Sequence, residues 1–235
     1  MKLQNLKFVP LSMVLLFSSV AAAIEDPIQV TSGAISGIEL GSGVSAYRGI
    51  PFAAPPVGDL RWQPPQPPIP WSGTLAAESY GSVCMQQRTE ALMSEDCLYL
   101  NVWTSAVAAK EKRPVMVWIH GGGWSSGASV NQDSSSTGIT GTYDGAAFAE
   151  NGVVLVSVNY RMSGFGFMAH PALSAESERG VSGNYGILDH IAALEWVQDN
   201  IAEFGGDPGN VTIFGESAGA ASVYALTATP LAKNL

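Results

Sequence analysis

A serine between two glycines is the feature of this sequence best suited to catalysis. Residues 215–219 read Gly-Glu-Ser-Ala-Gly, which places Ser217 in a G-x-S-x-G pattern. The β-branched and aromatic residues 211–214 precede the pattern and a segment rich in small residues follows it, so Ser217 is expected at a sharp turn between a strand and a helix. A five-residue match can arise by chance, but this context favours a nucleophilic serine. The chemistry would be acyl transfer through a covalent acyl-enzyme.

A second glycine cluster follows an apolar run. Residues 114–120 (PVMVWIH) are typical of a strand buried on both faces, and they lead directly into Gly121, Gly122 and Gly123. Glycines leave backbone N–H groups unshielded, and such groups can converge on the negative charge that develops on a carbonyl oxygen during acyl transfer. A flexible turn is the alternative interpretation. The position of the glycines after a buried strand and upstream of the G-x-S-x-G pattern favours an oxyanion hole.

The base that such a serine requires is missing from the expected place. A serine hydroxyl becomes nucleophilic when a histidine, oriented by a carboxylate, removes its proton, and after this type of motif the acid and the histidine follow the serine in the chain. Residues 218–235 contain no Asp, Glu or His. The three histidines, His120, His170 and His190, all precede Ser217, and each is more simply interpreted as structural. We therefore expect the triad acid and histidine to be absent from this chain.

Strand and helix patterns alternate around these motifs. Residues 153–158 (VVLVSV) predict another buried strand, and apolar residues at steps of three and four predict a helix over residues 184–204. Residues 144–151 predict a short helix closed by Gly152, and residues 30–50 predict short antiparallel strands joined by glycine turns. This order predicts an α/β fold with a mostly parallel central sheet and a small antiparallel sheet at the amino terminus.

Composition limits the class of protein. The 235 residues are 46% hydrophobic and 13% charged, and their formal net charge is −9. This length and apolar content permit one domain with a sizeable core, or part of a larger domain. A negative charge without a basic stripe argues against a nucleic-acid partner. Neither the cysteines nor the histidines are spaced as zinc ligands, so no metal and no cofactor is expected.

The amino terminus has the pattern of an export signal. Lys2 and Lys7 supply positive charge, residues 8–17 are apolar, and residues 21–23 are three alanines suited to cleavage. The apolar run is shorter than the ~20 residues that span a bilayer, and Pro10 interrupts it, which argues against a membrane anchor. We expect residues 1–23 to be a signal peptide, residues 24–235 to form one partial domain, and the protein to be secreted or periplasmic.

Three stretches of the chain resemble one known family. Residues 207–223 (DPGNVTIFGESAGAASV) resemble the type-B carboxylesterases, the cholinesterase-like branch of the α/β hydrolases. Residues 47–62 resemble the amino-terminal block of that family, and residues 94–103 (SEDCLYLNVW) resemble its second signature. The resemblance covers nearly all of residues 28–235 but only the amino-terminal half of a family member. It implies an α/β-hydrolase fold whose carboxy-terminal part is missing, and a serine carboxylic-ester hydrolase acting on a small-molecule ester.

The resemblance implies catalytic roles for individual residues. Ser217 would be the nucleophile, and the backbone N–H groups of Gly122, Gly123 and Ala218 would form the oxyanion hole. Glu216, beside the serine, is typical of the family without being its triad acid.

The resemblance also implies structural roles. Arg61 and Glu95 would form an ion pair, Arg161 would be a further ionic buttress, and Cys84 and Cys97 would form the first disulfide of the family. Two cysteines in an exported protein favour a disulfide on general grounds as well, with two free buried thiols as the alternative. The loop between them is shorter than in cholinesterases, which argues against choline esters as substrates.

Other functions are compatible with the same motifs. A catalytically inactive, cholinesterase-like adhesion or binding protein would share the fold, but such proteins commonly lose the nucleophile, which is present here as Ser217. A lipase or another acyl hydrolase would use the same machinery. Because no triad acid or histidine follows the serine, the chain resembles a fragment, and we expect the 235-residue polypeptide to be inactive alone. The sequence does not indicate an oligomeric state.

Overall fold

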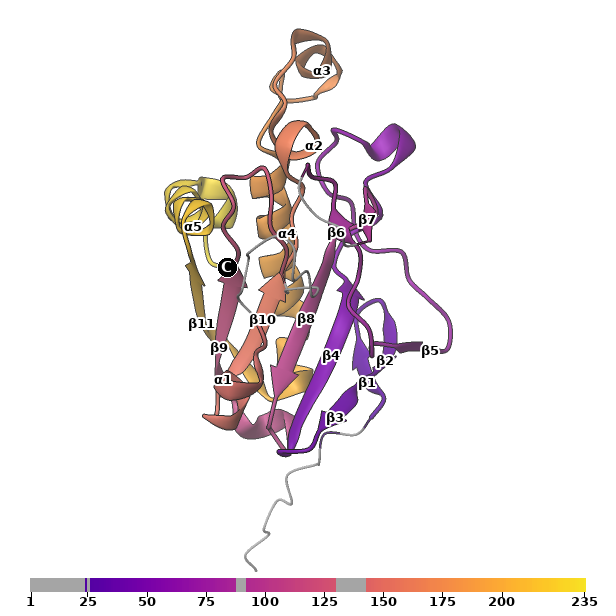
Figure 1. The fold of residues 1–235 in the computed structure, drawn as a ribbon, viewed down its shortest axis with the longest axis vertical. Helices are drawn as coiled ribbons and strands as arrows, with labels where there is room; N and C mark the ends of the chain where they lie inside the picture. Colours follow the sequence, from indigo (N-terminus) through magenta and orange to yellow (C-terminus); the bar gives the residue numbers. More distant parts are fainter. Residues whose placement is uncertain (1–23, 25, 88–91, 130–142) are drawn as a thin grey trace, which may run out of the picture.

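The computed structural model describes residues 24, 26–87, 92–129 and 143–235. The expected signal peptide, residues 1–23, lies outside the described residues. Figure 1 shows a twisted sheet with helices on both of its faces, as expected for an α/β fold. None of the helices in the described part of the chain combines the length and the apolar character that crossing a bilayer requires.

Within the described residues, the main sheet has six strands in the order β11-β9-β10-β8-β4-β3. Parallel pairing joins β9 to both β10 and β11, and antiparallel pairing joins the remaining neighbours. The antiparallel strands predicted near the amino terminus therefore extend the main sheet as well as forming a small one. The pairing of β3 with β4 is antiparallel because the short turn at residues 41–43 allows no other return. The bounds are β3 (Ile38–Leu40), β4 (Val44–Pro51), β8 (Tyr99–Thr104), β9 (Arg113–Ile119), β10 (Val154–Val158) and β11 (Gly206–Gly215).

Two smaller sheets lie in the amino-terminal part. Strands β1 (Ile28–Val30) and β2 (Gly33–Ser36) pair antiparallel, and β5 (Thr74–Ala76) pairs parallel with β2. Strands β6 (Val83–Cys84) and β7 (Met93–Ser94) form a separate pair. The indole of Trp71 donates a hydrogen bond to the carbonyl of Ala34 at 2.8 Å, which fixes the proline-rich stretch against the first of these sheets.

Among the described residues, α4 and α5 form the longest helices. Helix α4 (Tyr185–Asn200) runs for 16 residues and continues as a 3₁₀ turn at Ile201–Phe204, so the predicted helix over residues 184–204 is present with a tightened last turn. Residues 163–167 form a short helix that no sequence pattern predicts, and Gly166 in it packs directly against the carbonyl of Arg161. The other bounds are α1 (Ala146–Glu150), α2 (Ser163–Phe167), α3 (Pro171–Glu176) and α5 (Ala218–Ala228).

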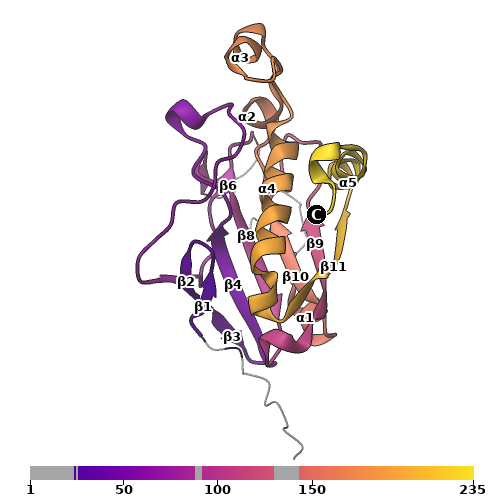
Figure 2. The same ribbon diagram turned by 180° about the vertical axis from the view of Figure 1, so that it is seen from behind.

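Alternating residues of the central strands divide the core between the two faces of the sheet. Ala46 and Trp103 pair across β4 and β8 and lie in a cluster with Ala149 of α1. Their neighbours Tyr47 and Val102 lie in the larger cluster, because successive side chains of a strand point to opposite faces. Figure 2 shows α4 crossing the sheet, and its apolar residues in the larger cluster include Ile191, Leu194 and Val197.

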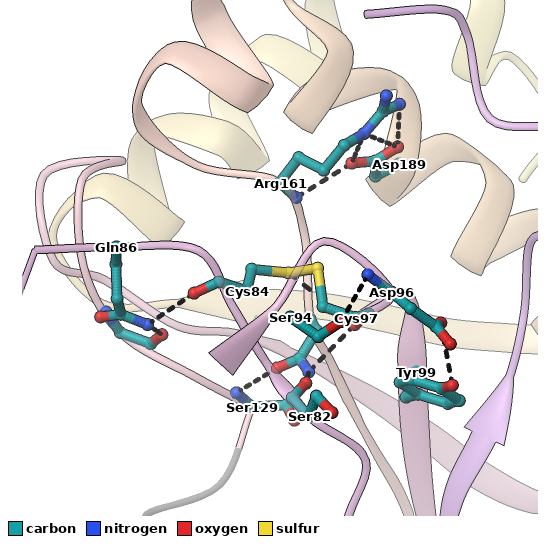
Figure 3. Close-up of a disulfide and its surroundings, with 12 residues drawn as sticks. Ser82, Cys84, Gln86, Ser94, Asp96, Cys97, Tyr99, Ser129, Arg161 and Asp189 are labelled. Carbon is teal, nitrogen blue, oxygen red and sulfur yellow. Dashed lines mark hydrogen bonds and ion pairs between the residues drawn. A yellow bond between two sulfur atoms is a disulfide. The ribbon is translucent and has the colours of Figure 1, made fainter. Parts of the chain in front are cut away.

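A disulfide closes the segment between β6 and β8. Cys84 and Cys97 are bonded, with 2% and 0% of their surfaces exposed, so the alternative of two free thiols is wrong (Figure 3). The carbonyl of Cys97 accepts a hydrogen bond from the amide of Asn159 at 3.1 Å. The disulfide ties β6 to the segment before β8, and the hydrogen bond from Asn159 ties that segment to the end of β10.

Removing the disulfide should lower stability without changing the fold. Cys84→Ala combined with Cys97→Ala frees the enclosed loop in the unfolded chain, and the expected loss is about 3 kcal/mol in the free energy of unfolding. Urea unfolding of the full-length protein, meaning the polypeptide encoded by the complete gene, measures this difference. An unchanged urea midpoint would show that the crosslink does not constrain the unfolded state.

Candidate active site

Ser217 occupies a strained turn between β11 and α5. Strand β11 ends at Gly215, α5 begins at Ala218, and the backbone of Ser217 has φ 53° and ψ −118°. A side chain at such positive φ costs free energy and persists only where its surroundings impose the conformation. The Ser217 side chain is exposed. Ser217 is therefore accessible from solvent at this turn.

The two glycines of the pattern let the turn pack against β9. Strands β9 and β11 pair in parallel with Gly215 opposite Ile119. A Cβ atom on Gly215 would lie 2.7 Å from the carbonyl oxygen of Ile119, and one on Gly219 would collide with that oxygen. Glycine is required at both positions because backbone atoms of β9 occupy the space that a side chain needs. The spacing of the motif thus reflects contact between the serine turn and the end of β9.

The glycine loop after β9 lies against the same turn. A Cβ atom on Gly121 would be 2.8 Å from the carbonyl oxygen of Glu216 and 3.1 Å from Cβ of Ser217. Gly122 and Gly123 have φ values of 102° and 63°, which only glycine adopts readily. The structure therefore brings together the two motifs that are about a hundred residues apart in the chain.

The peptide groups of the loop are oriented by its internal hydrogen bonds. The N–H groups of Ser125 and Ser126 both donate to the carbonyl of Gly122 at 3.1 Å. Because a trans peptide group points its N–H opposite to its carbonyl, the N–H of Gly123 faces away from that turn. Ala218 is the first residue of α5, where N–H groups lack intrahelical acceptors and the helix dipole favours negative charge.

His120 is buried beneath the loop and bonded to it. Its Nδ1–H donates to the carbonyl of Gly121 at 2.9 Å, and its own carbonyl accepts a hydrogen bond from the Tyr160 hydroxyl at 3.0 Å. The rings of His120 and Tyr160 stack with centroids 4.4 Å apart. Burial lowers the pKa of His120 to about 4, so its imidazole is neutral at pH 7. These contacts hold His120 as a support of the glycine loop.

The other two histidines are held by contacts with other elements. His190 lies in α4 with 1% of its surface exposed, and its ring contacts Tyr160 with centroids 4.4 Å apart. Burial, with a smaller effect from His120, lowers the pKa of His190 to about 3. His170 precedes α3, where its Nδ1 accepts a hydrogen bond from the backbone N–H of Ala172 at 3.1 Å.

A buried ion pair fixes the segment that carries Tyr160. The next residue, Arg161, donates from its backbone N–H, Nε and Nη2 to the carboxylate of Asp189, with distances from 2.7 to 3.2 Å (Figure 3). The Nη1 group donates to the carbonyl of Gln63 at 2.9 Å. The sequence singled out Arg161 but not Asp189, because an acid inside an apolar helix gives no sign of its partner. The burial of Asp189 is not evident from the sequence, so no local signal was available for this pair.

Arg61 and Glu95 form a second ion pair nearer the surface. Nε and Nη2 of Arg61 donate to the two carboxylate oxygens of Glu95 at 2.5 and 2.6 Å. The side chains are 38% and 22% exposed, so solvent screens the pair and its contribution to stability is small. No group of three or more His, Cys, Asp or Glu side chains within the described ranges is arranged to hold a metal ion.

Comparison with known proteins identifies the family. The profile of the carboxylesterase family matches residues 25–235. The chain belongs to the carboxylesterase family. Fumonisin B1 esterase of Sphingopyxis macrogoltabida is 50% identical over 224 residues, which are 92% of this chain and 39% of that protein. Carboxylesterase 1E of Mus musculus is 47% identical over 210 residues, which are 82% of this chain and 34% of that protein.

A solved carboxylesterase has the same fold. The carboxylesterase of Geobacillus stearothermophilus superimposes with a TM-score of 0.77 at 48% identity, and the match covers 88% of this chain and 42% of that one. The described residues therefore form part of an α/β-hydrolase fold, as the sequence resemblance implied. The chain spans only 39% of the fumonisin esterase and 42% of the solved carboxylesterase.

Glycine in place of Ser217 should relieve the strain of the turn. Ser217→Gly removes the side chain that opposes a φ of 53°, whereas Ser217→Ala keeps a Cβ atom in the same conformation. We expect the glycine variant to be more stable than the alanine variant by about 1 kcal/mol, measured by urea unfolding of the full-length protein. Equal stability of the two variants would contradict a strained serine.

His190 should make stability fall as the pH falls. The unfolded chain binds a proton at the ordinary histidine pKa of about 6.5, whereas the folded chain does not until the pH approaches about 3, so acid favours unfolding between these values. Between pH 7 and pH 5, His190→Gln should lose about 2 kcal/mol less than the wild type, as measured by urea unfolding at both pH values. An identical loss in both proteins would show that His190 is protonated when folded.

Proposed function

We propose that this chain supplies the nucleophile and the oxyanion hole of a serine carboxylic-ester hydrolase. The observation that carries the proposal is the packing of Ser217 against the glycine loop, with Cβ of the serine 3.1 Å from the position that a Cβ of Gly121 would occupy. A strained serine beside glycine amides and the first turn of a helix is the arrangement that acyl transfer requires. Family membership over residues 25–235 supports the same assignment.

In the proposed mechanism, Ser217 Oγ attacks the carbonyl carbon of an ester. The carbonyl oxygen becomes negatively charged and accepts hydrogen bonds from the N–H groups of Gly122, Gly123 and Ala218. The alcohol leaves with a proton, an acyl-enzyme forms on Ser217, and water then releases the carboxylic acid and restores the hydroxyl. Each oxyanion donor would contribute about 3 to 4 kcal/mol of transition-state stabilisation.

The proton acceptor is assigned to no residue of this chain. His120 uses its Nδ1–H to hold Gly121, His170 caps α3, and His190 is buried in α4. No Asp, Glu or His occurs among residues 218–235, where this type of enzyme places its acid and base. We therefore infer that the 235-residue polypeptide is inactive alone and that the whole protein supplies the acid and base.

The proposed substrates are small-molecule carboxylic esters. Proteins similar to this chain are named fumonisin B1 esterase and carboxylesterase 1E, and both names denote ester hydrolysis. The proposed setting is outside the cytoplasm, after removal of residues 1–23, and the motifs require no cofactor. A lipase would use the same serine and oxyanion hole and would differ in the chain length of the acyl group that it accepts.

Labelling by a fluorophosphonate tests the proposed role of Ser217. The probe phosphonylates a serine only when a base activates the hydroxyl and an oxyanion hole receives the phosphoryl oxygen. We expect the full-length protein to be labelled, and Ser217→Ala to abolish labelling together with hydrolysis of p-nitrophenyl esters. A folded full-length protein that is not labelled would instead support an inactive binding protein. A series of p-nitrophenyl esters from acetate to palmitate separates an esterase from a lipase.

A further inference from the structure

Trp124 connects the glycine loop to the helix that begins after the nucleophile. It follows Gly123 directly, and its indole N–H donates to the hydroxyl of Ser222 at 3.0 Å. Ser222 is fully buried in α5, one helical turn after Ala218. Residues four apart lie on the same side of a helix, so the indole is bonded to α5 one turn from the Ala218 amide. The bond thus joins the two parts of the proposed oxyanion hole.

Burial alone does not fix the position of Trp124. The residue is 36% exposed and has a φ of 55°, which is unfavourable for a residue with a side chain. Its carbonyl accepts a hydrogen bond from the N–H of Ser163 at 2.7 Å, and its ring contacts Phe167 with centroids 5.8 Å apart. Trp124 is therefore held from α2 on one side and from α5 on the other.

An oxyanion hole made from two elements needs a constraint between them. The Gly122 and Gly123 amides belong to the loop after β9, whereas the Ala218 amide belongs to α5. The donors must all lie about 3 Å from one oxygen atom, and a shift of about 1 Å in one of them loses most of its effect. The left-handed glycines give the loop little stiffness of its own.

We propose that Trp124 is a positioning residue, whose indole hydrogen bond to Ser222 sets the spacing between the loop amides and the Ala218 amide. This inference rests on the proposed esterase function. Trp124 itself forms no bond to the substrate in this account. Its contribution is to hold the loop at the distance from α5 that a tetrahedral oxyanion requires.

The test compares four variants of the full-length protein. Trp124→Phe keeps the aromatic contact with Phe167 and removes the N–H, whereas Ser222→Ala removes the acceptor, and the double variant removes both. Trp71→Phe is the matched control, because it removes an indole hydrogen bond of 2.8 Å in the amino-terminal sheet, away from the loop. Each variant is first shown to unfold cooperatively.

Activity and hydrogen exchange are measured on each variant. Activity is given by the rate of fluorophosphonate labelling and by kcat and KM for p-nitrophenyl acetate. We expect Trp124→Phe and Ser222→Ala each to lower the labelling rate and kcat about fivefold with little change in KM, the size expected for losing one hydrogen bond. The double variant should be no slower than either single variant, because both remove the same bond. Trp71→Phe should match the wild type.

The second measurement is hydrogen exchange of the peptide that covers residues 121–127. Exchange should be faster in Trp124→Phe and in Ser222→Ala but not in Trp71→Phe, because the loop loses its bond to α5. Three results would each overturn the positioning role: unchanged exchange in the variants, additive losses of activity in the double variant, or faster exchange with an unchanged labelling rate.

A wild-type protein that is not labelled refutes the esterase proposal and, with it, the catalytic importance of this spacing. Hydrogen exchange would still decide whether the Trp124–Ser222 bond constrains the loop.

Discussion

The candidate site depends on the parallel pairing of β9 with β11. This pairing sets Gly215 opposite Ile119, so the serine turn and the glycine loop leave neighbouring strands at the same level. The carbonyl groups of Ile119 and His120 then lie against the α-carbon of Gly219. A side chain at that position would force the two strands apart. The geometry of the proposed oxyanion hole is therefore a consequence of backbone contact between two strand ends, which is the edge where α/β folds place their ligands.

Support for the glycine loop comes from a buried polar layer below it. Tyr160 binds the carbonyl of His120, and the next residue, Arg161, is anchored to Asp189 of α4 by three donors. An Arg–carboxylate pair in the interior gives geometric definition, although its removal from water offsets much of its electrostatic gain. Because both histidines around Tyr160 are buried and neutral at pH 7, the layer stays uncharged except for this pair. The position of the glycine loop therefore depends on the packing of α4 against the sheet.

The sequence predicted the elements that carry strong local signals. The apolar runs at residues 114–120 and 153–158 correspond to β9 and β10, and the helical period correctly located α4. The sequence placed the start of the last strand at Val211, whereas β11 begins at Gly206. The register of β11 shifts between these residues, so regular pairing does begin at Val211. Local pattern therefore located the paired core of the strand and missed its irregular extension.

Side-chain partners between distant segments were beyond prediction from the sequence. Nothing in the chain pairs Arg161 with Asp189, or Trp124 with Ser222, because such contacts follow from how α4 and α5 pack on the sheet. Helix α2 was not predicted, because its sequence SGFGF has low helix propensity, and the contact of Gly166 with the carbonyl of Arg161 is visible only in the fold. The resemblance to a family supplied the Arg61–Glu95 pair, which spacing alone does not indicate.

In the proposed site, one hydroxyl and three backbone amides face a common oxygen atom. A crystal structure of the full-length protein after phosphonylation tests it most directly, because the phosphoryl oxygen takes the place of the oxyanion. We expect a covalent bond from Ser217 Oγ to phosphorus, with the phosphoryl oxygen about 2.7 to 3.1 Å from the nitrogen atoms of Gly122, Gly123 and Ala218. Phosphorus on another residue, or a phosphoryl oxygen directed away from these amides, would contradict it.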